Sequence, residues 1–273
     1  MMEVNTKNLT AAERVVLARK TERPSTRDYI EAVIDDFIPL AGDRNKGEDE
    51  SILGGIGFFR GKPVTVIGHQ KGNDLEENIK YRFGMPNPEG YRKAIRLMEQ
   101  AEKFKRPVIT FVDTPGAYPG IEAEAGGQGE AIAKYIATMS CLKVPTVSVF
   151  IGEGGSGGAL AIGVADKMIM LENSFFSILS PEGFALILWK DSSRWEEACE
   201  VMKLTAGDLL ELGICDKVIE EGEGAHINKT HIFNSVEREI AKALGQLSGK
   251  KGEQLAAERY KKLRNIGRDY GRD

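Results

Sequence analysis

The chain has 273 residues, of which 41% are hydrophobic and 29% are charged, and its formal net charge at pH 7 is −4. This balance is typical of a soluble globular protein with a buried core, and the negative charge argues against a general nucleic-acid-binding or membrane-surface protein. The sequence has no apolar run near the roughly 20 residues of a membrane span, and its three cysteines form no C-x-x-C motif. We therefore expect a cytoplasmic protein with reduced thiols.

The first 50 residues are predicted to form a mainly helical N-terminal segment. Residues 10–38 have the pattern of two helices separated near Pro24, with candidate capping residues directly after this proline. A polar loop over residues 42–51 is expected to end the segment.

The central domain is expected to span residues 51–228 and to begin with a β-hairpin. Apolar and polar residues alternate on both sides of a turn at Arg60-Gly61-Lys62. A charged loop over residues 71–80 is expected next. Beyond residue 88 the patterns alternate as in α/β proteins, with helices predicted at 89–104, 128–142, 158–165 and 183–189 and buried strands at 107–113, 145–151 and 167–171.

The end of the chain is predicted to contain a strand, a long helix and a basic tail. Residues 205–220 have a helical pattern that stops at Gly213 and then a strand pattern. The final segment, 229–273, begins with a helix predicted over 229–247. Its tail over 249–273 has eight Lys/Arg against four Asp/Glu, which predicts a solvated helix, with contact to an acidic partner as the alternative.

The stretch "FIGEGGSGGALAIG" (150–163) matches two short motifs. Gly152, Gly154 and Gly157 fit the dinucleotide-binding pattern G-x-G-x-x-G. A dinucleotide-binding βαβ unit takes about 30 residues, whereas Phe150 and Met170, in the two flanking strands, are only 20 residues apart. This spacing argues against a dinucleotide site.

The same stretch contains G-x-S-x-G, the pattern of a hydrolase nucleophile, centred on Ser156. A serine nucleophile needs a histidine base that is oriented by an acid. The order Ser156, Asp216, His226 is formally possible, but His226 lies in a polar stretch after a strand. A serine hydrolase therefore remains an alternative.

A third interpretation uses only the backbone of this stretch. Glycines before a helix leave its first N–H groups accessible, at the positive end of the helix dipole, where they form an anion site or an oxyanion hole. A second glycine turn, "DTPGAYPG" (113–120), leaves the preceding buried strand. Both turns follow the carboxyl ends of consecutive strands, where α/β sheets build their sites. A purely packing role of these glycines is the structural alternative, and "SPEG" (180–183) is predicted to cap a helix through Ser180.

Several long stretches resemble one known family. They are "PVTVIGHQKG", "FGMPNPEGYRKAIRLMEQAEKFKRPVITFVDTPGAYPG", "IGEGGSGGALAIGVADKMIMLEN", "SPEGFALILWKD" and "TAGDLLELGICDKVIEE". From about Arg14 to His226 the chain is similar to the α subunits of bacterial acetyl-coenzyme A carboxylase carboxyltransferase. The resemblance implies an α/β fold of the crotonase-like (ClpP/crotonase) type, a superhelix of repeated ββα units, in a superfamily whose reactions share an oxyanion hole for acyl-thioester enolates.

The resemblance also implies an activity and partners. The family moves a carboxyl group from carboxybiotin to acetyl-CoA and so makes malonyl-CoA for fatty-acid synthesis. The α subunit holds no cofactor or metal of its own, since carboxybiotin is presented by the biotin carboxyl carrier protein and acetyl-CoA is a substrate. Its implied partners are a β subunit, in an α2β2 assembly, and biotin carboxylase. A decarboxylase, a carboxyltransferase for another acyl-CoA and a non-catalytic assembly subunit remain the rival interpretations.

The residues that match the family's motifs are the candidate site. The resemblance assigns backbone oxyanion donors to the glycine turn, with the last two nearest the helix start: Gly154, Gly155, Gly157 and Gly158. The opposite wall is expected from Gly116, Ala117, Tyr118, Pro119 and Gly120. Candidate contacts for phosphate or carboxylate are Lys71, Arg82 and Arg92, which could equally be surface charges. Ala125-Gly126 stand where the family commonly has an acid–arginine pair, so no charged pair is expected there.

Overall fold

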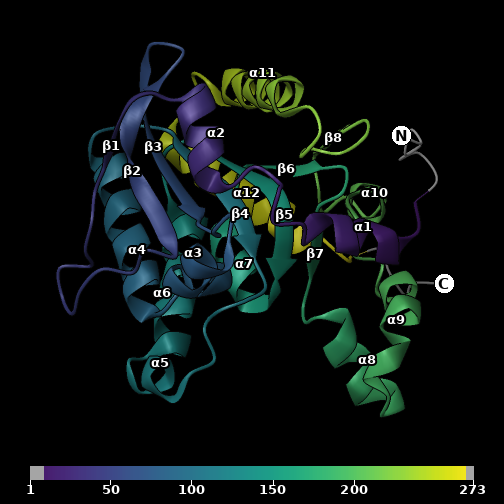
Figure 1. Ribbon diagram of the computed structural model, residues 1–273. Helices are drawn as coiled ribbons and strands as arrows, with labels where there is room; N and C mark the ends of the chain where they lie inside the picture. Colours follow the sequence, from purple (N-terminus) through teal and green to yellow (C-terminus); the bar gives the residue numbers. More distant parts are fainter. Residues whose placement is uncertain (1–8, 269–273) are drawn as a thin grey trace.

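The apolar runs in the middle of the chain form the centre of an eight-stranded mixed sheet in the computed structural model, which describes residues 9–268 (Figure 1). The strand order is β1-β2-β3-β4-β5-β6-β8, and β7 pairs with the end of β5. Pairing is antiparallel from β1 to β3 and parallel from β3 onward. The strands are β1 (Asp35–Pro39), β2 (Ile52–Phe59), β3 (Lys62–His69), β4 (Val108–Thr114), β5 (Thr146–Gly155), β6 (Lys167–Leu171), β7 (Phe175–Ser177) and β8 (Lys217–Ile219).

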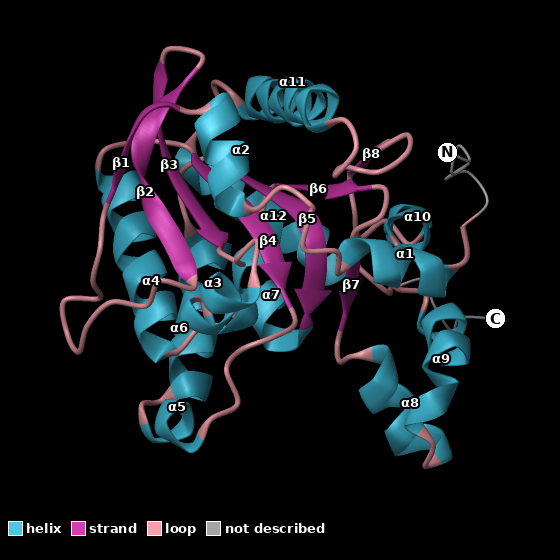
Figure 2. Ribbon diagram, viewed as in Figure 1, coloured by secondary structure: helices cyan, strands magenta, loops and turns pink. Residues whose placement is uncertain are grey.

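Helices cover both faces of this sheet (Figure 2). Over the residues that the structure describes, none of them is both long enough and apolar enough to cross a membrane. The helices are α1 (Ala11–Ala18), α2 (Thr26–Val33), α3 (Leu75–Lys80), α4 (Pro88–Lys103), α5 (Ile121–Ala125), α6 (Gln128–Cys141), α7 (Ser156–Gly163), α8 (Pro181–Trp189), α9 (Trp195–Met202), α10 (Ala206–Glu211), α11 (Lys229–Leu247) and α12 (Gly252–Asn265), with short 3-10 turns at Arg82–Gly84 and Ser192–Arg194.

The alternation of side chains along the central strands divides the core into two layers. Every residue of β4 and β5 is buried, as expected of parallel strands covered on both faces. On β4, Val108 and Val112 contact the layer built by α4, α6 and α7. Ile109 and Phe111 point to the other layer, built by α2 and α11. The two layers fix the carboxyl ends of β3, β4 and β5 beside one another.

Two expectations for the first part of the chain are wrong. The helix expected to reach residue 38 ends at Val33, and residues 35–39 form strand β1, which pairs with β2 across an irregular register. The charged loop expected over 71–80 contains α3, whose N-cap Asp74 accepts a hydrogen bond from the Glu77 backbone. Both elements are too short to produce a clear periodic pattern.

The crossover from β5 to β6 is shorter than the usual βαβ unit, yet it joins parallel neighbours. Helix α7 has eight residues, and β6 pairs only with Val147–Phe150 in the first half of β5. A short helix suffices because it does not have to return along the whole of β5. The unit is therefore shorter than a dinucleotide-binding βαβ unit, as the spacing in the sequence predicts.

The basic tail forms α12, as expected, but this helix is anchored as well as solvated. Leu255 and Arg259 are buried, and the Arg259 guanidinium bonds with both carboxylate oxygens of Asp166 at 3.0 and 2.8 Å. The prediction of a solvated helix is therefore wrong for this face of α12. A single arginine among eight basic residues of a tail gives no sequence signal of burial.

Candidate active site

The two glycine turns meet at the carboxyl ends of β4 and β5. The sequence predicts that this strand ends at residue 151. Strand β5 instead continues to Gly155. Thr114 of β4 lies opposite Gly154, and β7 pairs with Gly154 and Gly155 on the other side. The three-residue strand β7 was not predicted, and its pairing extends β5 through the glycines.

The two glycine turns pack against each other through their backbone atoms. A Cβ atom on Gly155 would lie 2.0 Å from the carbonyl oxygen of Pro115, and one on Gly158 would lie 2.7 Å from the amide nitrogen of Ala117. No side chain fits in either position, because real Cβ atoms do not come so close to backbone atoms. These two glycines therefore have a packing role, which was the structural alternative, whether or not their amides also bind a ligand.

The first backbone N–H groups of α7 are candidate hydrogen-bond donors for a ligand. Ser156 has a φ of +53°, an uncommon value for a non-glycine residue, and it turns the chain sharply from β5 into the helix. Among the residues that the structure describes, no side chain caps this helix, so its first N–H groups have no side-chain cap. A Cβ atom on Gly157 would meet only a methyl group of Ile132 at 3.7 Å, so this residue has open space around it.

The loop over residues 115–120 is held by its own hydrogen bonds. The Gly116 amide donates to Thr114 Oγ1 at 3.0 Å, and the Tyr118 amide donates to the Pro86 carbonyl at 3.0 Å. Gln128 Nε2 donates to the Tyr118 carbonyl at 2.9 Å. The amides of Gly116 and Tyr118 are thus already bonded within the chain, so the loop is built as a fixed wall.

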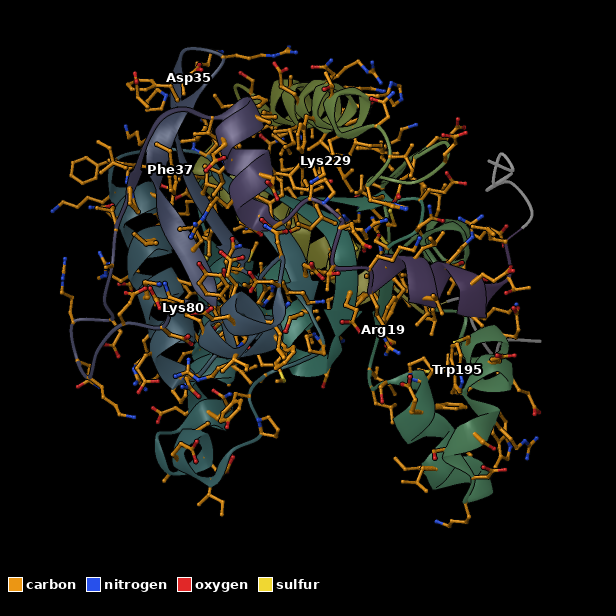
Figure 3. The ribbon with its side chains drawn as sticks, in the orientation of Figure 1. Arg19, Asp35, Phe37, Lys80, Trp195 and Lys229 are labelled. Carbon is orange, nitrogen blue, oxygen red and sulfur yellow. The ribbon has the colours of Figure 1, made fainter. Side chains whose placement is uncertain are left out.

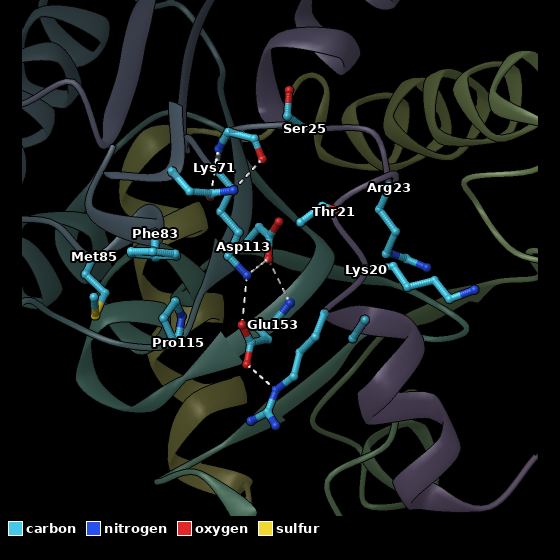
Figure 4. A pocket seen from close by; sticks show the side chains of 14 residues that line it. Lys20, Thr21, Arg23, Ser25, Lys71, Phe83, Met85, Asp113, Pro115 and Glu153 are labelled. Carbon is cyan, nitrogen blue, oxygen red and sulfur yellow. Dashed lines mark hydrogen bonds and ion pairs between the residues drawn. The ribbon is translucent and has the colours of Figure 1, made fainter. Parts of the chain in front are cut away.

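A cleft of about 520 Å³ lies beside the two turns. Its charged lining includes Lys71, Asp113, Glu153 and Arg19, and Phe83, Met85 and Pro115 contribute apolar surface (Figure 4). The Lys71 ammonium lies 2.8 Å from Asp113 Oδ1 and 2.8 Å from Glu153 Oε2. Arg19, which directly follows α1 (Figure 3), contacts the other Glu153 oxygen through its Nε at 2.8 Å. Its guanidinium also reaches Glu182 of α8 at 2.6 Å.

The protonation states of this cluster follow from its pairing. Burial alone would raise the pKa of the Glu153 carboxyl, but Lys71 and Arg19 outweigh this effect and hold the pKa below its ordinary value. Burial would lower the pKa of the Lys71 ammonium, but Asp113 and Glu153 raise it above its ordinary value. Nearby, burial and the charge of Lys71 lower the pKa of His69 to about 3, so this imidazole is neutral near pH 7.

The other two predicted cations are engaged in ion pairs. Arg82 Nη1 lies 3.1 Å from Asp49 Oδ1, with its guanidinium near the ring of Tyr118. Arg92 Nε lies 2.8 Å from Asp43 Oδ2, and its Nη1 donates to the Gly126 carbonyl at 3.1 Å. Arg92 therefore ties the loop around residue 43 to the segment that follows α5, and neither arginine lines the cleft described above.

The structure does not assemble the triad of Ser156, Asp216 and His226. Asp216 directly precedes the amino end of β8, whereas Ser156 follows the carboxyl end of β5, so the two residues lie at opposite ends of the parallel strands. Asp216 accepts a hydrogen bond from the Met168 amide at 2.7 Å and forms an ion pair with Lys262. His226 Nε2 lies 3.2 Å from Lys20 Nζ. The hydrolase alternative therefore lacks an acid for its base.

Replacing Ser156 with alanine is expected to lower any activity of this site by less than about tenfold. Loss of a true serine nucleophile would instead cost about a million-fold. Ser156 is exposed, and His226, the base of the candidate triad, lies against Lys20 instead. Steady-state kinetics of Ser156→Ala and mass spectrometry after fluorophosphonate treatment check this. Stoichiometric labelling of Ser156 would contradict the backbone interpretation.

Comparison with known proteins adds independent findings. The profile of the family described as acetyl co-enzyme A carboxylase carboxyltransferase-like matches residues 1–267. The acetyl-coenzyme A carboxylase carboxyl transferase subunit alpha of Clostridium acetobutylicum is 57% identical over 97% of this chain and 97% of its own length. A protein of Natranaerobius thermophilus named as subunits beta/alpha is 57% identical over 96% of this chain and 44% of its own length.

Solved structures extend the comparison to the fold. A transcarboxylase 12S structure with methylmalonyl-coenzyme A bound superposes with a TM-score of 0.70 at 20% identity, over 92% of this chain. This chain spans about half, 47%, of that protein. At this identity the likeness bears on the fold alone, and it confirms the expected crotonase-like α/β architecture.

Proposed function

The chain belongs to the acetyl co-enzyme A carboxylase carboxyltransferase-like family, and from this premise we propose that it is the α subunit that transfers a carboxyl group from carboxybiotin to acetyl-CoA, giving malonyl-CoA. The observation that carries the proposal is the contact of two glycine turns beside the uncapped start of α7. Such an arrangement presents backbone donors without side chains in the way, as an acyl-thioester enolate or a ureido anion requires.

The chemistry needs few side chains of this subunit. Release of CO2 from carboxybiotin leaves negative charge on the ureido oxygen, and acetyl-CoA becomes an enolate when its methyl group loses a proton to that ureido group. The enolate carbon then bonds to the released CO2, which gives malonyl-CoA and neutral biotin. Backbone donors at the start of α7, at Gly157 and Gly158, are proposed to stabilise this charge. One oxyanion donor contributes about 3–4 kcal/mol to the transition state. The fixed loop over residues 116–120 is the proposed opposite wall.

The proposed assembly is an α2β2 complex that works with a biotin carboxyl carrier protein and biotin carboxylase in the cytoplasm. This chain matches only 44% of the length of the relative that is named as subunits beta/alpha. This supports a β partner for a separate α chain. The β subunit is proposed to supply the second oxyanion hole and much of the CoA site.

The test is to purify the chain with and without a β partner and to measure malonyl-CoA formation from carboxybiotin and acetyl-CoA. We expect activity only from the assembled pair. Activity of the isolated chain would contradict a shared site, and an inactive but fully assembled pair would overturn the proposed function.

A further inference from the structure

Three consecutive strands of the parallel part of the sheet each bring one charged residue to the same place. Lys71 follows β3, Asp113 lies near the end of β4, and Glu153 lies near the end of β5. The Lys71 ammonium lies between the two carboxylates at 2.8 Å from each, as Figure 4 shows. The three side chains are largely buried, so solvent screens these ion pairs little.

The Asp113 carboxylate is also bonded to the backbone of the segment that carries the other glycine turn. Asp113 Oδ1 accepts the Glu153 backbone N–H at 2.9 Å. Asp113 is three residues before Gly116 in one turn, and Glu153 directly precedes Gly154 in the other. Any displacement of Lys71 or Asp113 therefore acts on both turns at once.

Two glycines make room for this cluster. A Cβ atom on Gly152 would lie 2.5 Å from Asp113 Oδ1, and one on Gly84 would lie 2.9 Å from Lys71 Cγ. Gly84 ends a turn in which Arg82 and Phe83 also have positive φ, of +48° and +56°. Non-glycine residues with positive φ are strained, and this strained turn lies where it covers Lys71.

We propose that Lys71 is a positioning residue, which holds the two glycine turns in register through Asp113 and Glu153, and that it does not contact the substrate. Its ammonium already has two carboxylate partners, and these would repel an approaching phosphate or carboxylate. This inference rests on the proposed carboxyl transfer, because it explains how the proposed donors are held.

The experiment uses the full chain assembled with its β partner and compares kcat with KM for both substrates. Lys71→Met removes the charge at similar length and is expected to lower kcat about 10- to 100-fold, the cost of a displacement near 1 Å, with both KM values unchanged. Asp113→Asn keeps the acceptor oxygen for the Glu153 amide. Adding it to Lys71→Met removes the excess negative charge and is expected to recover at least part of kcat.

Lys80→Met is the matched control, because Lys80 forms an exposed ion pair with Glu50, in the turn before β2, and it is expected to leave both constants unchanged. A rise in the KM for acetyl-CoA or carboxybiotin at constant kcat in Lys71→Met would overturn the proposal. So would a loss of kcat that Asp113→Asn does not relieve. If Lys71→Met fails to assemble, Asp113→Asn alone decides: a lower kcat at constant KM supports the proposal, and an unchanged kcat overturns it. An inactive wild-type complex would instead refute the proposed function.

Discussion

Gly158→Ala is expected to reduce carboxyl transfer by the assembled enzyme at least about 100-fold. The added Cβ atom would lie 2.7 Å from the Ala117 nitrogen and 2.8 Å from the Gly116 carbonyl carbon. Both are backbone atoms of a loop that is itself hydrogen-bonded to Pro86 and Thr114, so the loop must move as a unit. A displacement of about 1 Å at a reacting centre costs about 100-fold. Steady-state rates of malonyl-CoA formation measure the effect.

Gly157→Ala is the control for this prediction. It adds the same methyl group one residue earlier, where the nearest atom is a methyl carbon of Ile132 at 3.7 Å. We expect this variant to fold and assemble as the wild type and to lose much less activity than Gly158→Ala. If the two variants lost activity equally, the methyl group would be blocking the ligand in both, and displacement of the loop would not be the cause.

The general position of the candidate site could be predicted from the sequence. Buried strand patterns alternate with helices, so the turns after residues 113 and 151 had to lie at one edge of a parallel sheet. What each glycine does could not be predicted. Gly152, Gly155 and Gly158 each face a different neighbour, namely the Asp113 carboxylate, the Pro115 carbonyl and the Ala117 amide. These contacts exist only when β4 and β5 are paired.

The charged cluster around Lys71 is a second feature that could not be predicted from the sequence. Asp113 follows Lys71 by 42 residues and Glu153 follows Asp113 by 40, and nothing in the sequence connects the three charges. Only the parallel order of β3, β4 and β5 brings the Lys71 ammonium to 2.8 Å from each of the two carboxylates. The burial of Arg259 was missed for a related reason, since its partner Asp166 is far away in the sequence and the surrounding composition is polar.

Replacing Arg259 with methionine is expected to lower the free energy of unfolding by about 3–5 kcal/mol, the usual cost of removing one partner of a buried ion pair. The guanidinium contacts both oxygens of Asp166, and its Nη1 also donates to the carbonyls of Met139 and Leu142, at 2.8 and 2.9 Å. These carbonyls belong to the end of α6, so the substitution leaves buried acceptors as well as a carboxylate without their donor. Urea denaturation of the full chain measures the change. Arg264→Met, on an exposed position of the same helix, should change stability by no more than about 0.5 kcal/mol. Equal stability of the two variants would show that α12 is held by its apolar contacts and not by this arginine.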